Sequence, residues 1–307
     1  MVDEAVAKAL AGKPRVVLAV SGGTDSMALL EAAAHTARAR ISAVATFDHG
    51  TGEAARRAAA LVADRTLALG LKIVTGQSGH SAQSGQPGHT EAEWRAARWA
   101  FLRGVAREAR ATVVTAHTRD DQVETVVMRI MRAAGARGLA GLYADSDVLR
   151  PFVDVPRSAI AAYIREHNIS VIDDPSNHSR RHLRNRVRLD LLPALRRVRP
   201  KVDEEILAIA RRAAEWRREI ERLVKGFCPV DRMGDHFAVA AADLEGYDPA
   251  SLAIIWPAIA ARAGVTLDWR GTSRVVAFTT GGRVGSSIQL SGGVEVVRTR
   301  AQFVIRP

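Results

Sequence analysis

Short apolar runs alternate with longer amphipathic segments through the first two-thirds of the chain. The run Val16–Val20, for example, is rich in β-branched residues and is followed by a segment with helical spacing of apolar residues. Strands that alternate with helices in this way are typical of βαβ units, so the pattern predicts a doubly wound parallel sheet. Strands are expected at 16–20, 41–47, 71–74 and 112–116, and helices at 53–69, 91–110, from 120 or 121 onward, and at 156–168.

The pattern changes near residue 200. Apolar residues at helical spacing from Ile206 to Leu223 predict a long amphipathic helix, and the segment 286–307 is β-rich around a Ser-Gly-Gly turn at 291–293. We therefore expect an α/β domain over 1–199, a linker helix over 200–225 and a small α+β domain over 226–307.

Composition adds one unusual quantity, which is charge. The length of 307 residues suggests about two domains, and a hydrophobic fraction of 47% is ordinary for a globular protein. The net charge, however, is +11. This charge favours a polyanionic partner, either nucleic acid or an anionic membrane surface. No apolar run approaches the roughly 20 residues of a membrane span, and no signal peptide is evident. The single cysteine, Cys228, excludes an intrachain disulfide, and we expect a cytoplasmic protein.

The hexapeptide Ser21–Ser26 has the features of a phosphate-binding loop. It joins the first predicted strand to a helix, and a helix N-terminus offers free N–H groups and a positive dipole end. Asp25 beside phosphates is reasonable if a divalent cation bridges them. The alternative is a plain glycine turn in which Thr24 or Asp25 caps the helix. The residues expected at a phosphate are Ser21, Gly22, Gly23, Thr24, Asp25 and Ser26.

The stretch 117–125 follows the fourth predicted strand and contains His117, Asp120, Asp121 and Glu124. The paired aspartates are able to hold Mg²⁺ or orient an ammonium group, and a histidine is able to act as a general base near neutral pH. Alternatively, Asp121 and Glu124 form a capping box that only begins a helix. Carboxyl ends of parallel strands share one edge of a sheet, so this stretch is expected to lie beside the phosphate loop.

Two further stretches carry candidate ligands. Asp48 and His49 end the second predicted strand, where they either contact a nucleoside or form a solvated loop. Residues 180–199 contain eight arginines and one acid, Asp190, which favours contacts with phosphate over a solvated surface.

Ser-Gly-Gly-x-Asp-Ser resembles the pyrophosphate-binding loop of PP-loop ATPases, and the order of the other stretches resembles the tRNA(Ile)-lysidine synthase family. The sequence departs from that family's pattern at Thr51-Gly52, His89-Thr90 and Trp99. The stretches that match are Ser21–Ser26, Asp48-His49-Gly50, Glu91-x-x-x-Arg95-x-x-Arg98-Trp99, His117–Thr125, Arg137–Leu142, Arg150-Pro151, Asp173–Asn177 and Arg184–Arg188.

This resemblance implies an adenine nucleotide α-hydrolase-like fold that uses ATP and Mg²⁺ to join L-lysine to the wobble cytidine of tRNA(Ile) with a CAU anticodon. It implies catalytic roles for His117, Asp120, Asp121 and Asp25, and Asp25 and Asp121 would hold the metal. It further implies a nucleotide site that includes Asp48 and His49, and a C-terminal domain in contact with tRNA. The implied substrate-binding residues are Glu91, Arg95, Asp173, Arg184, Asn185, Arg186 and Arg188.

Two alternatives to this activity are a tRNA thiolase and a non-catalytic RNA-binding protein. A thiolase usually needs a Cys pair or an iron–sulfur cluster, which one cysteine disfavours. Retention of both the loop and the His/Asp/Asp cluster argues against a protein without catalysis. The sequence leaves the oligomeric state open, a homodimer included.

Overall fold

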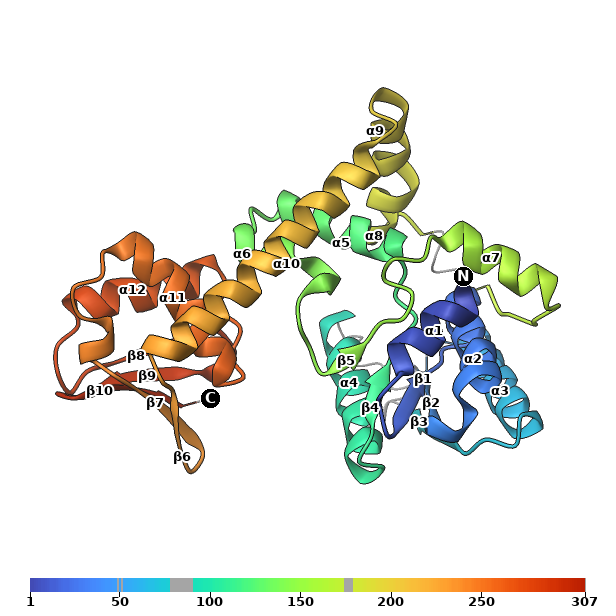
Figure 1. Ribbon diagram of the computed structural model, residues 1–307, viewed down its shortest axis with the longest axis horizontal. Helices are drawn as coiled ribbons and strands as arrows, with labels where there is room; N and C mark the ends of the chain where they lie inside the picture. Colours follow the sequence, from blue (N-terminus) through green and yellow to red (C-terminus); the bar gives the residue numbers. More distant parts are fainter. Residues whose placement is uncertain (49, 51, 78–90, 174–178, 307) are drawn as a thin grey trace. The chain divides into compact units, whose positions relative to one another are not determined.

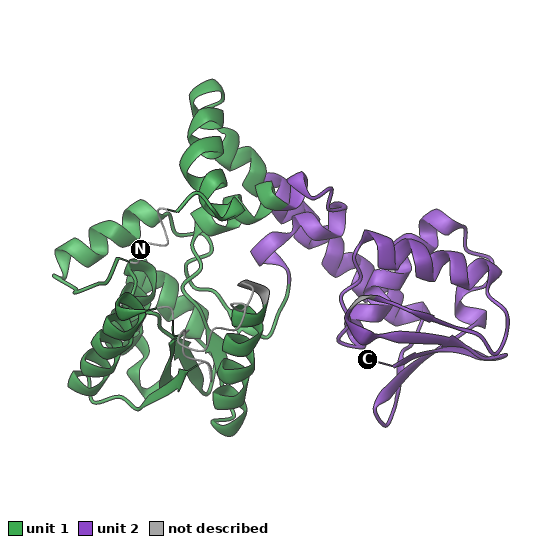
Figure 2. Ribbon diagram, turned by 180° about the vertical axis from the view of Figure 1, so that it is seen from behind, with its two compact units in different colours: residues 1–128, 145–207 green, residues 129–144, 208–307 purple. Residues whose placement is uncertain are grey.

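The computed structural model describes the whole chain except residues 49, 51, 78–90, 174–178 and 307 (Figure 1). The chain divides into two compact units, one made of residues 1–128 and 145–207 and the other of 129–144 and 208–307 (Figure 2). Helices α5 (Arg119–Met131) and α10 (Val202–Phe227) each contribute residues to both units. Within the described ranges, no helix combines the length and apolarity that crossing a membrane requires.

The first unit contains a five-stranded parallel sheet, which confirms the predicted fold class. Its strand order is β3-β2-β1-β4-β5, and every adjacent pair is parallel. Strands β2 and β3 are added on one side of β1, and β4 and β5 on the other. The direction in which strands are added therefore reverses between β1 and β4. The strands are β1 (Val16–Ala19), β2 (Ile41–Asp48), β3 (Ile73–Gln77), β4 (Thr112–Val114) and β5 (Val148–Leu149).

Helices cover both faces of this sheet. One face packs against the helices that contribute Leu10, Leu30, Val62 and Ile160 to the main core. The other face packs against α4, which buries Leu102 and Ala106. Alternate residues of β1 point to opposite cores, and complete burial of each large aliphatic side chain stabilises the unit by about 1.5–3 kcal/mol. The helices on the first face are α1 (Val2–Leu10), α2 (Thr24–Ala37), α3 (Glu53–Ala68) and α7 (Arg157–Glu166), and α4 (Glu91–Glu108) covers the other.

The strands differ from the sequence predictions in three places. Strand β3 begins at Ile73 rather than at residue 71, because the Leu71 N–H donates to the carbonyl of Thr66 and so closes α3. Strand β5 was not predicted, since two residues are too few to carry a periodic signal. Residues 171–173, which were expected to end a strand, lie outside any strand.

The second unit contains a five-stranded antiparallel sheet of order β6-β7-β10-β9-β8. Its core surrounds Trp256, whose indole N–H donates to Thr279 Oγ1 at 2.8 Å and whose ring meets Phe303 edge to face. The predicted turn at 291–293 does join two strands, whereas the exposed β6–β7 hairpin was missed. The elements are β6 (Asp231–Met233), β7 (His236–Ala240), α11 (Pro249–Arg262), α12 (Trp269–Gly281), β8 (Ser287–Gln289), β9 (Glu295–Arg298) and β10 (Gln302–Arg306).

The remaining helical segments of the described chain are short. Those near the site are α8 (Leu183–Arg186), a π-helical turn at Val187–Leu191 and α9 (Leu192–Val198). The others are α6 (Ala136–Leu139) and 3-10 turns at Arg38–Arg40, Gly141–Tyr143, Ala242–Leu244 and Ser291–Gly293.

Candidate active site

The loop after β1 is closed by its own serines. Ser26 Oγ donates to the Gly23 carbonyl at 3.0 Å, accepts the Ser21 N–H at 3.1 Å and lies 3.2 Å from Ser21 Oγ. Helix α2 begins at Thr24 with Gly23 as its N-cap, and no side chain caps it. The alternative prediction of a cap by Thr24 or Asp25 is therefore wrong. The first-turn N–H groups have no side-chain acceptor, as an anion site requires.

The two glycines of this loop meet different surroundings. Gly22 has φ +84°, and a Cβ built on it would lie 2.9 Å from both Cβ and the carbonyl oxygen of Ala58. A Cβ on Gly23 would meet no atom within 4 Å. Gly22 therefore permits close packing of the loop on α3, whereas Gly23 borders open space.

Helix α5 begins with a capping box one turn earlier than predicted. Thr118 Oγ1 accepts the Asp121 N–H at 3.2 Å, and Asp121 Oδ2 accepts the Thr118 N–H at 2.8 Å. The alternative in which Asp121 and Glu124 form the box is wrong, because Glu124 pairs with arginines instead. Parallel pairing of β1 with β4 brings this helix start to the same sheet edge as the phosphate loop, as predicted.

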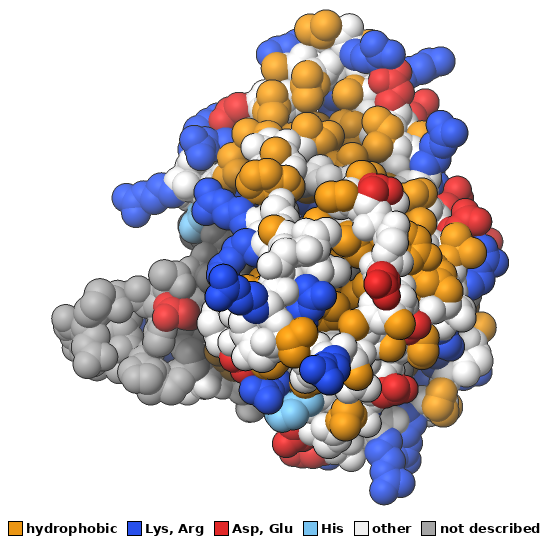
Figure 3. Space-filling model, turned by 90° about the vertical axis from the view of Figure 1, so that its left-hand side faces the viewer, with side chains coloured by type: hydrophobic (Ala, Val, Ile, Leu, Met, Phe, Trp, Pro, Cys, Tyr) orange, Lys and Arg blue, Asp and Glu red, His pale blue; other side chains and the backbone are white. Residues whose placement is uncertain are grey.

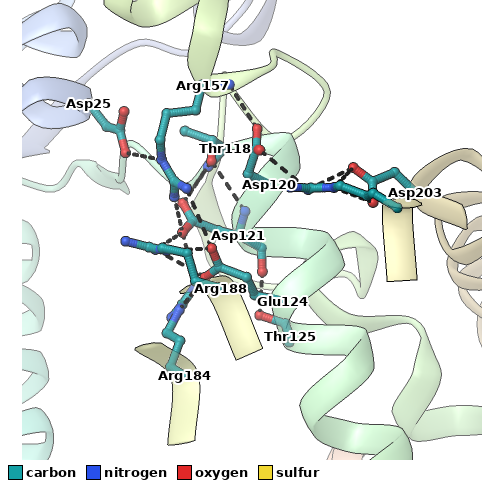
Figure 4. Close-up of polar contacts among 11 residues, drawn as sticks. Asp25, Thr118, Asp120, Asp121, Glu124, Thr125, Arg157, Arg184, Arg188 and Asp203 are labelled. Carbon is teal, nitrogen blue, oxygen red and sulfur yellow. Dashed lines mark hydrogen bonds and ion pairs between the residues drawn. The ribbon is translucent and has the colours of Figure 1, made fainter. Parts of the chain in front are cut away.

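Arg157 links the phosphate loop to this helix start (Figure 4). Its Nε lies 3.6 Å from Asp25 Oδ2, its Nη2 lies 2.9 Å from Asp121 Oδ1, and its Nη1 lies 3.4 Å from Glu124 Oε1. The fork of one guanidinium thus spans acids from α2 and α5. We call the set Asp25, Asp121, Glu124, Arg157, Arg184 and Arg188 the acid–arginine network.

Arg184 and Arg188 complete this network from α8 and the turn that follows it. Arg184 Nε donates to Glu124 Oε2 at 2.8 Å, and Arg188 Nε donates to Glu124 Oε1 at 2.6 Å. Both guanidinium groups also reach Asp121 Oδ1, at 3.0 and 3.4 Å. Because the Glu124 side chain is only 1% exposed, these contacts are needed to hold its charge in the interior.

The two aspartates of the network differ in their ionisation. Burial raises the pKa of Asp25 to about 6, since Arg157 offsets only part of the desolvation. Burial also acts on the pKa of Asp121, but Arg184 and Arg157 outweigh it and lower that pKa below its ordinary value. Asp25 Oδ1 is buried and accepts no hydrogen bond. An unpaired buried acceptor with a raised pKa is the property expected of a group that awaits a cation or a donor.

Asp120 has a different position from the one expected of a catalytic carboxylate. Its Oδ2 accepts the Arg157 backbone N–H at 2.8 Å, so it caps the start of α7. Its Oδ1 lies 3.9 Å from Arg196, which is held mainly by Asp203 at 2.8 Å. These contacts make Asp120 a link between helices.

His117 lies at the same edge, with Nδ1 2.8 Å from Thr115 Oγ1. Burial, and then the charges of Arg184, Arg150 and Arg98, lower the pKa of His117 to about 4, although Asp121 acts in the opposite direction. The imidazole is therefore neutral at pH 7.

The arginine-rich segment 180–199 is largely neutralised by acids from elsewhere, contrary to expectation. Besides Arg184 and Arg188, Arg196 pairs with Asp203 and Arg199 pairs with Glu205. Even Asp190, within the segment, pairs with Arg180. Among the residues that the structure describes, Arg181, Arg186 and Arg197 have no ion pair and stay available for a phosphate contact.

The remaining predicted ligands are more dispersed. Asp48 Oδ1 accepts the Gly50 N–H at 2.8 Å and so shapes the turn after β2. Asn185 is buried and donates to the Ser179 carbonyl, while Arg186, Arg95 and Asp173 are exposed. His49 and the Glu91 side chain lie outside the described residues. Arg157 was not predicted as a site residue, because its contacts with Asp25, Asp121 and Glu124 form only in the folded chain.

The predicted metal ligands fit a Mg²⁺ ion only in part. Asp25 Oδ1 is free to coordinate, whereas hydrogen bonds from Thr118 and three arginines already surround both oxygens of Asp121. Within the described parts of the chain, no group of three or more His, Cys, Asp or Glu side chains is arranged to hold a metal. Mg²⁺ is commonly bound through one or two carboxylates together with substrate phosphates, which matches Asp25 alone.

Comparisons with known proteins agree with this geometry. Residues 2–195 match the PP-loop domain family ATP_bind_3. The tRNA(Ile)-lysidine synthase of Salinispora tropica is 34% identical over 92% of this chain and 88% of its own length. That of Streptomyces coelicolor is also 34% identical, over 95% and 85%. Among solved structures, the U34-tRNA thiolase NcsA from Methanococcus maripaludis superposes with a TM-score of 0.57 at 14% identity, over 70% of this chain and 78% of its own, and so shares the fold.

Proposed function

Because this chain belongs to the tRNA(Ile)-lysidine synthases of the PP-loop family, we propose that it uses ATP to join L-lysine to C2 of the wobble cytidine in tRNA(Ile) with a CAU anticodon. The observation that carries the proposal is the single arginine, Arg157, which connects the phosphate loop to the carboxylates of α5. A loop for phosphates and the acid–arginine network then lie side by side. Such adjacency suits an adenylation followed by an amine attack.

In the first step, the cytidine O2 attacks the α-phosphorus of ATP, the bond to the β-phosphate breaks, and pyrophosphate leaves. The Ser21–Ser26 loop would hold the polyphosphate through the free N–H groups of α2. Asp25 would hold Mg²⁺ through its unpaired Oδ1, and the ion would neutralise phosphate charge when bound. This assignment leaves Asp121 out of the metal site.

In the second step, the ε-amine of lysine attacks C2, the C2–O2 bond breaks, and AMP leaves. Arg184 and Arg188, among the more exposed members of the acid–arginine network, offer guanidinium groups to the lysine carboxylate, whereas Glu124 is buried against three arginines. The amine must lose a proton before it attacks, and neutral His117 is the acceptor at this edge. Phosphates bound near Arg98, Arg150 and Arg184 would raise the pKa of His117, because they offset the charges that lower it.

We also propose that the second unit contacts tRNA and that the protein acts in the cytoplasm. On the face seen in Figure 3, Lys and Arg side chains lie among exposed hydrophobic ones, with some Asp and Glu side chains between them. The basic and apolar side chains of this face suit contacts with a phosphate backbone and unstacked bases. The thiolase alternative is disfavoured, because the one cysteine of the chain, Cys228, is buried in the second unit and is too few for a cluster.

The direct test is incubation with labelled lysine, ATP, Mg²⁺ and transcripts of the CAU-anticodon isoleucine and methionine tRNAs. Label is expected on the isoleucine transcript alone and only with ATP. Equal labelling of the two transcripts would contradict the substrate assignment. Pyrophosphate release without lysine incorporation would indicate another PP-loop tRNA-modifying activity.

Substitutions of the two glycines in the loop allow an effect on stability to be distinguished from an effect on ATP binding. We expect Gly22→Ala to lower the free energy of unfolding by about 2 kcal/mol or more, because a left-handed φ and contact with Ala58 both oppose it. Gly23→Ala should change stability by less than about 1 kcal/mol, since its Cβ meets nothing. It should nevertheless weaken ATP binding at least tenfold, because the methyl group enters the space proposed for phosphate. Urea unfolding and equilibrium ATP titration measure the two effects, and ATP affinity equal to the parent's in Gly23→Ala would contradict the phosphate assignment.

A further inference from the structure

Arg98, on α4, has no acidic partner. Its side chain is half-buried and forms no ion pair with any described residue, and its Nε is buried without a hydrogen-bond acceptor. Burial and the charges of Arg95 and Arg184 lower the pKa of Arg98. A guanidinium held in this way retains donors that only an external acceptor can satisfy.

Arg150, directly after β5, has the same property. Its Nη1 donates to neutral acceptors, namely Ser146 Oγ at 2.8 Å and the Val148 carbonyl at 3.3 Å. Its Nε is buried without a hydrogen-bond acceptor. Burial lowers the pKa of Arg150, and the charge of Asp147, which acts in the opposite direction, does not restore it. Two arginines with orphaned Nε donors therefore come from different elements, α4 and the end of β5.

The sheet places these donors beside the active site. Val114 of β4 pairs with Leu149 of β5, so Arg150 follows its strand at the same edge as His117. Leu102 of α4 packs in the same core cluster as Val148 of β5, and Arg98 lies one turn before Leu102, so α4 brings Arg98 to the β4–β5 side of the sheet. The charges of Arg98 and Arg150 both act on the pKa of His117, in agreement with this placement. Strand β4 lies between β5 and β1 in the sheet, so this side of the sheet edge adjoins the phosphate loop after β1.

We infer that Arg98 and Arg150 form a second anion site, which binds a backbone phosphate of the tRNA next to the wobble nucleotide. The inference rests on the proposed function, because the Ser21–Ser26 loop is already assigned to the phosphates of ATP. Cytidine O2 has to reach the α-phosphorus, and on the β4–β5 side of the loop the unpaired donors of Arg98 and Arg150 are placed to hold a phosphodiester that flanks this nucleotide. Guanidinium groups match a phosphate in both shape and charge, and the Nε donors of both arginines are buried without a hydrogen-bond acceptor. The pair thus acts as a positioning site for the base to be adenylated.

The test uses Arg98→Gln and Arg150→Gln in the full chain, with lysidine formation and tRNA binding measured at several salt concentrations. Each substitution should weaken tRNA binding about five- to tenfold and lower the slope of log affinity against log salt by about 0.7–1, as expected for the loss of one phosphate contact. The KM values for ATP and lysine should stay within about twofold of the parent.

Arg107→Gln is the matched control, since Arg107 is exposed on the same helix and forms no ion pair with the described residues. It should leave the tRNA affinity and its salt slope unchanged. Arg98→Lys keeps the charge and should restore part of the affinity, so it carries the test if Arg98→Gln does not fold. A rise in the KM for ATP alone would reassign the site to the nucleotide, a rise for lysine alone would reassign it to the amino-acid carboxylate, and no change would exclude an anion there.

The failure of this inference is distinguishable from failure of the proposed function. If the parent protein transfers no lysine to the tRNA, the function itself is wrong. If the parent does so and both glutamine variants bind tRNA normally, only the second anion site is wrong.

Discussion

Asp25→Asn is expected to abolish pyrophosphate release while it makes the free protein more stable at neutral pH. The loss of activity follows from the loss of the negative charge at the carboxylate whose unpaired oxygen is placed to hold Mg²⁺, and losses of about 10²–10³-fold are typical when such a charge-stabilising group is removed. Binding of the tRNA should change less than twofold, because Asp25 is not among the residues assigned to it. Release of pyrophosphate from ATP and tRNA measures the first effect, and normal release would remove Asp25 from the mechanism.

The gain in stability follows from the raised pKa of Asp25. This pKa is about 6 in the folded state against an ordinary 3.8, so above pH 6 the folded chain holds a charge that the unfolded chain solvates better. Asparagine removes that penalty, and we expect a gain of roughly 1–3 kcal/mol at pH 7.5. The gain should shrink as the pH falls from 6 towards 4, because the parent then protonates Asp25 in its folded state.

Urea unfolding at pH 7.5 and pH 4.5 tests this stability effect. Asp64→Asn is the control, since Asp64 is exposed on α3 and forms no ion pair with the described residues. It should change stability by less than about 0.5 kcal/mol at either pH. A lower stability of Asp25→Asn at pH 7.5 would show that the contact with Arg157 outweighs desolvation.

Glu124→Gln is expected to produce the largest loss of stability. Glu124 is 1% exposed and holds Arg157, Arg184 and Arg188, so the neutral amide leaves three guanidinium groups with the Asp121 carboxylate as their shared counter-charge within the network. Removal of one partner from a buried ion-pair network costs about 3–5 kcal/mol, because the remaining charges stay desolvated. Urea unfolding measures the change.

An exposed ion pair provides the comparison. Arg199 and Glu205 lie 2.7 Å apart, but their side chains are 69% and 43% exposed. Glu205→Gln should therefore cost less than about 1 kcal/mol, because water solvates the arginine that is left. If Glu124→Gln costs no more than this, other acceptors replace Glu124, and the network is not the stabilising element described above.

The sequence was sufficient for the parallel sheet, because β1 and β2 are apolar runs of the kind that a strand buried on both faces carries, and helical segments separate them. It also located the loop and the start of α5, since both follow strand ends. It could not supply β5, which consists of two residues and is defined by pairing with β4.

The sequence predicted the carboxylates of the site, but it did not predict which arginines pair with them. Asp25 and Asp121 stand in recognisable motifs, whereas Arg157 is 36 residues distant from Asp121 and reaches it only because α7 begins beside α5. The arginines of 184–188 were noted for their charge, yet their contacts with Glu124 depend on acids about 60 residues away. Long-range ion pairs of this kind leave no local periodicity.

The capping box at the start of α5 joins two requirements in one side chain. Asp121 gives one oxygen to the helix start and the other to three arginines. A substitution of Asp121 therefore changes both the start of α5 and the charge balance of the acid–arginine network. A homologue that replaces this aspartate must compensate for both at once, and the position should tolerate change only where Thr118 and the arginines change with it.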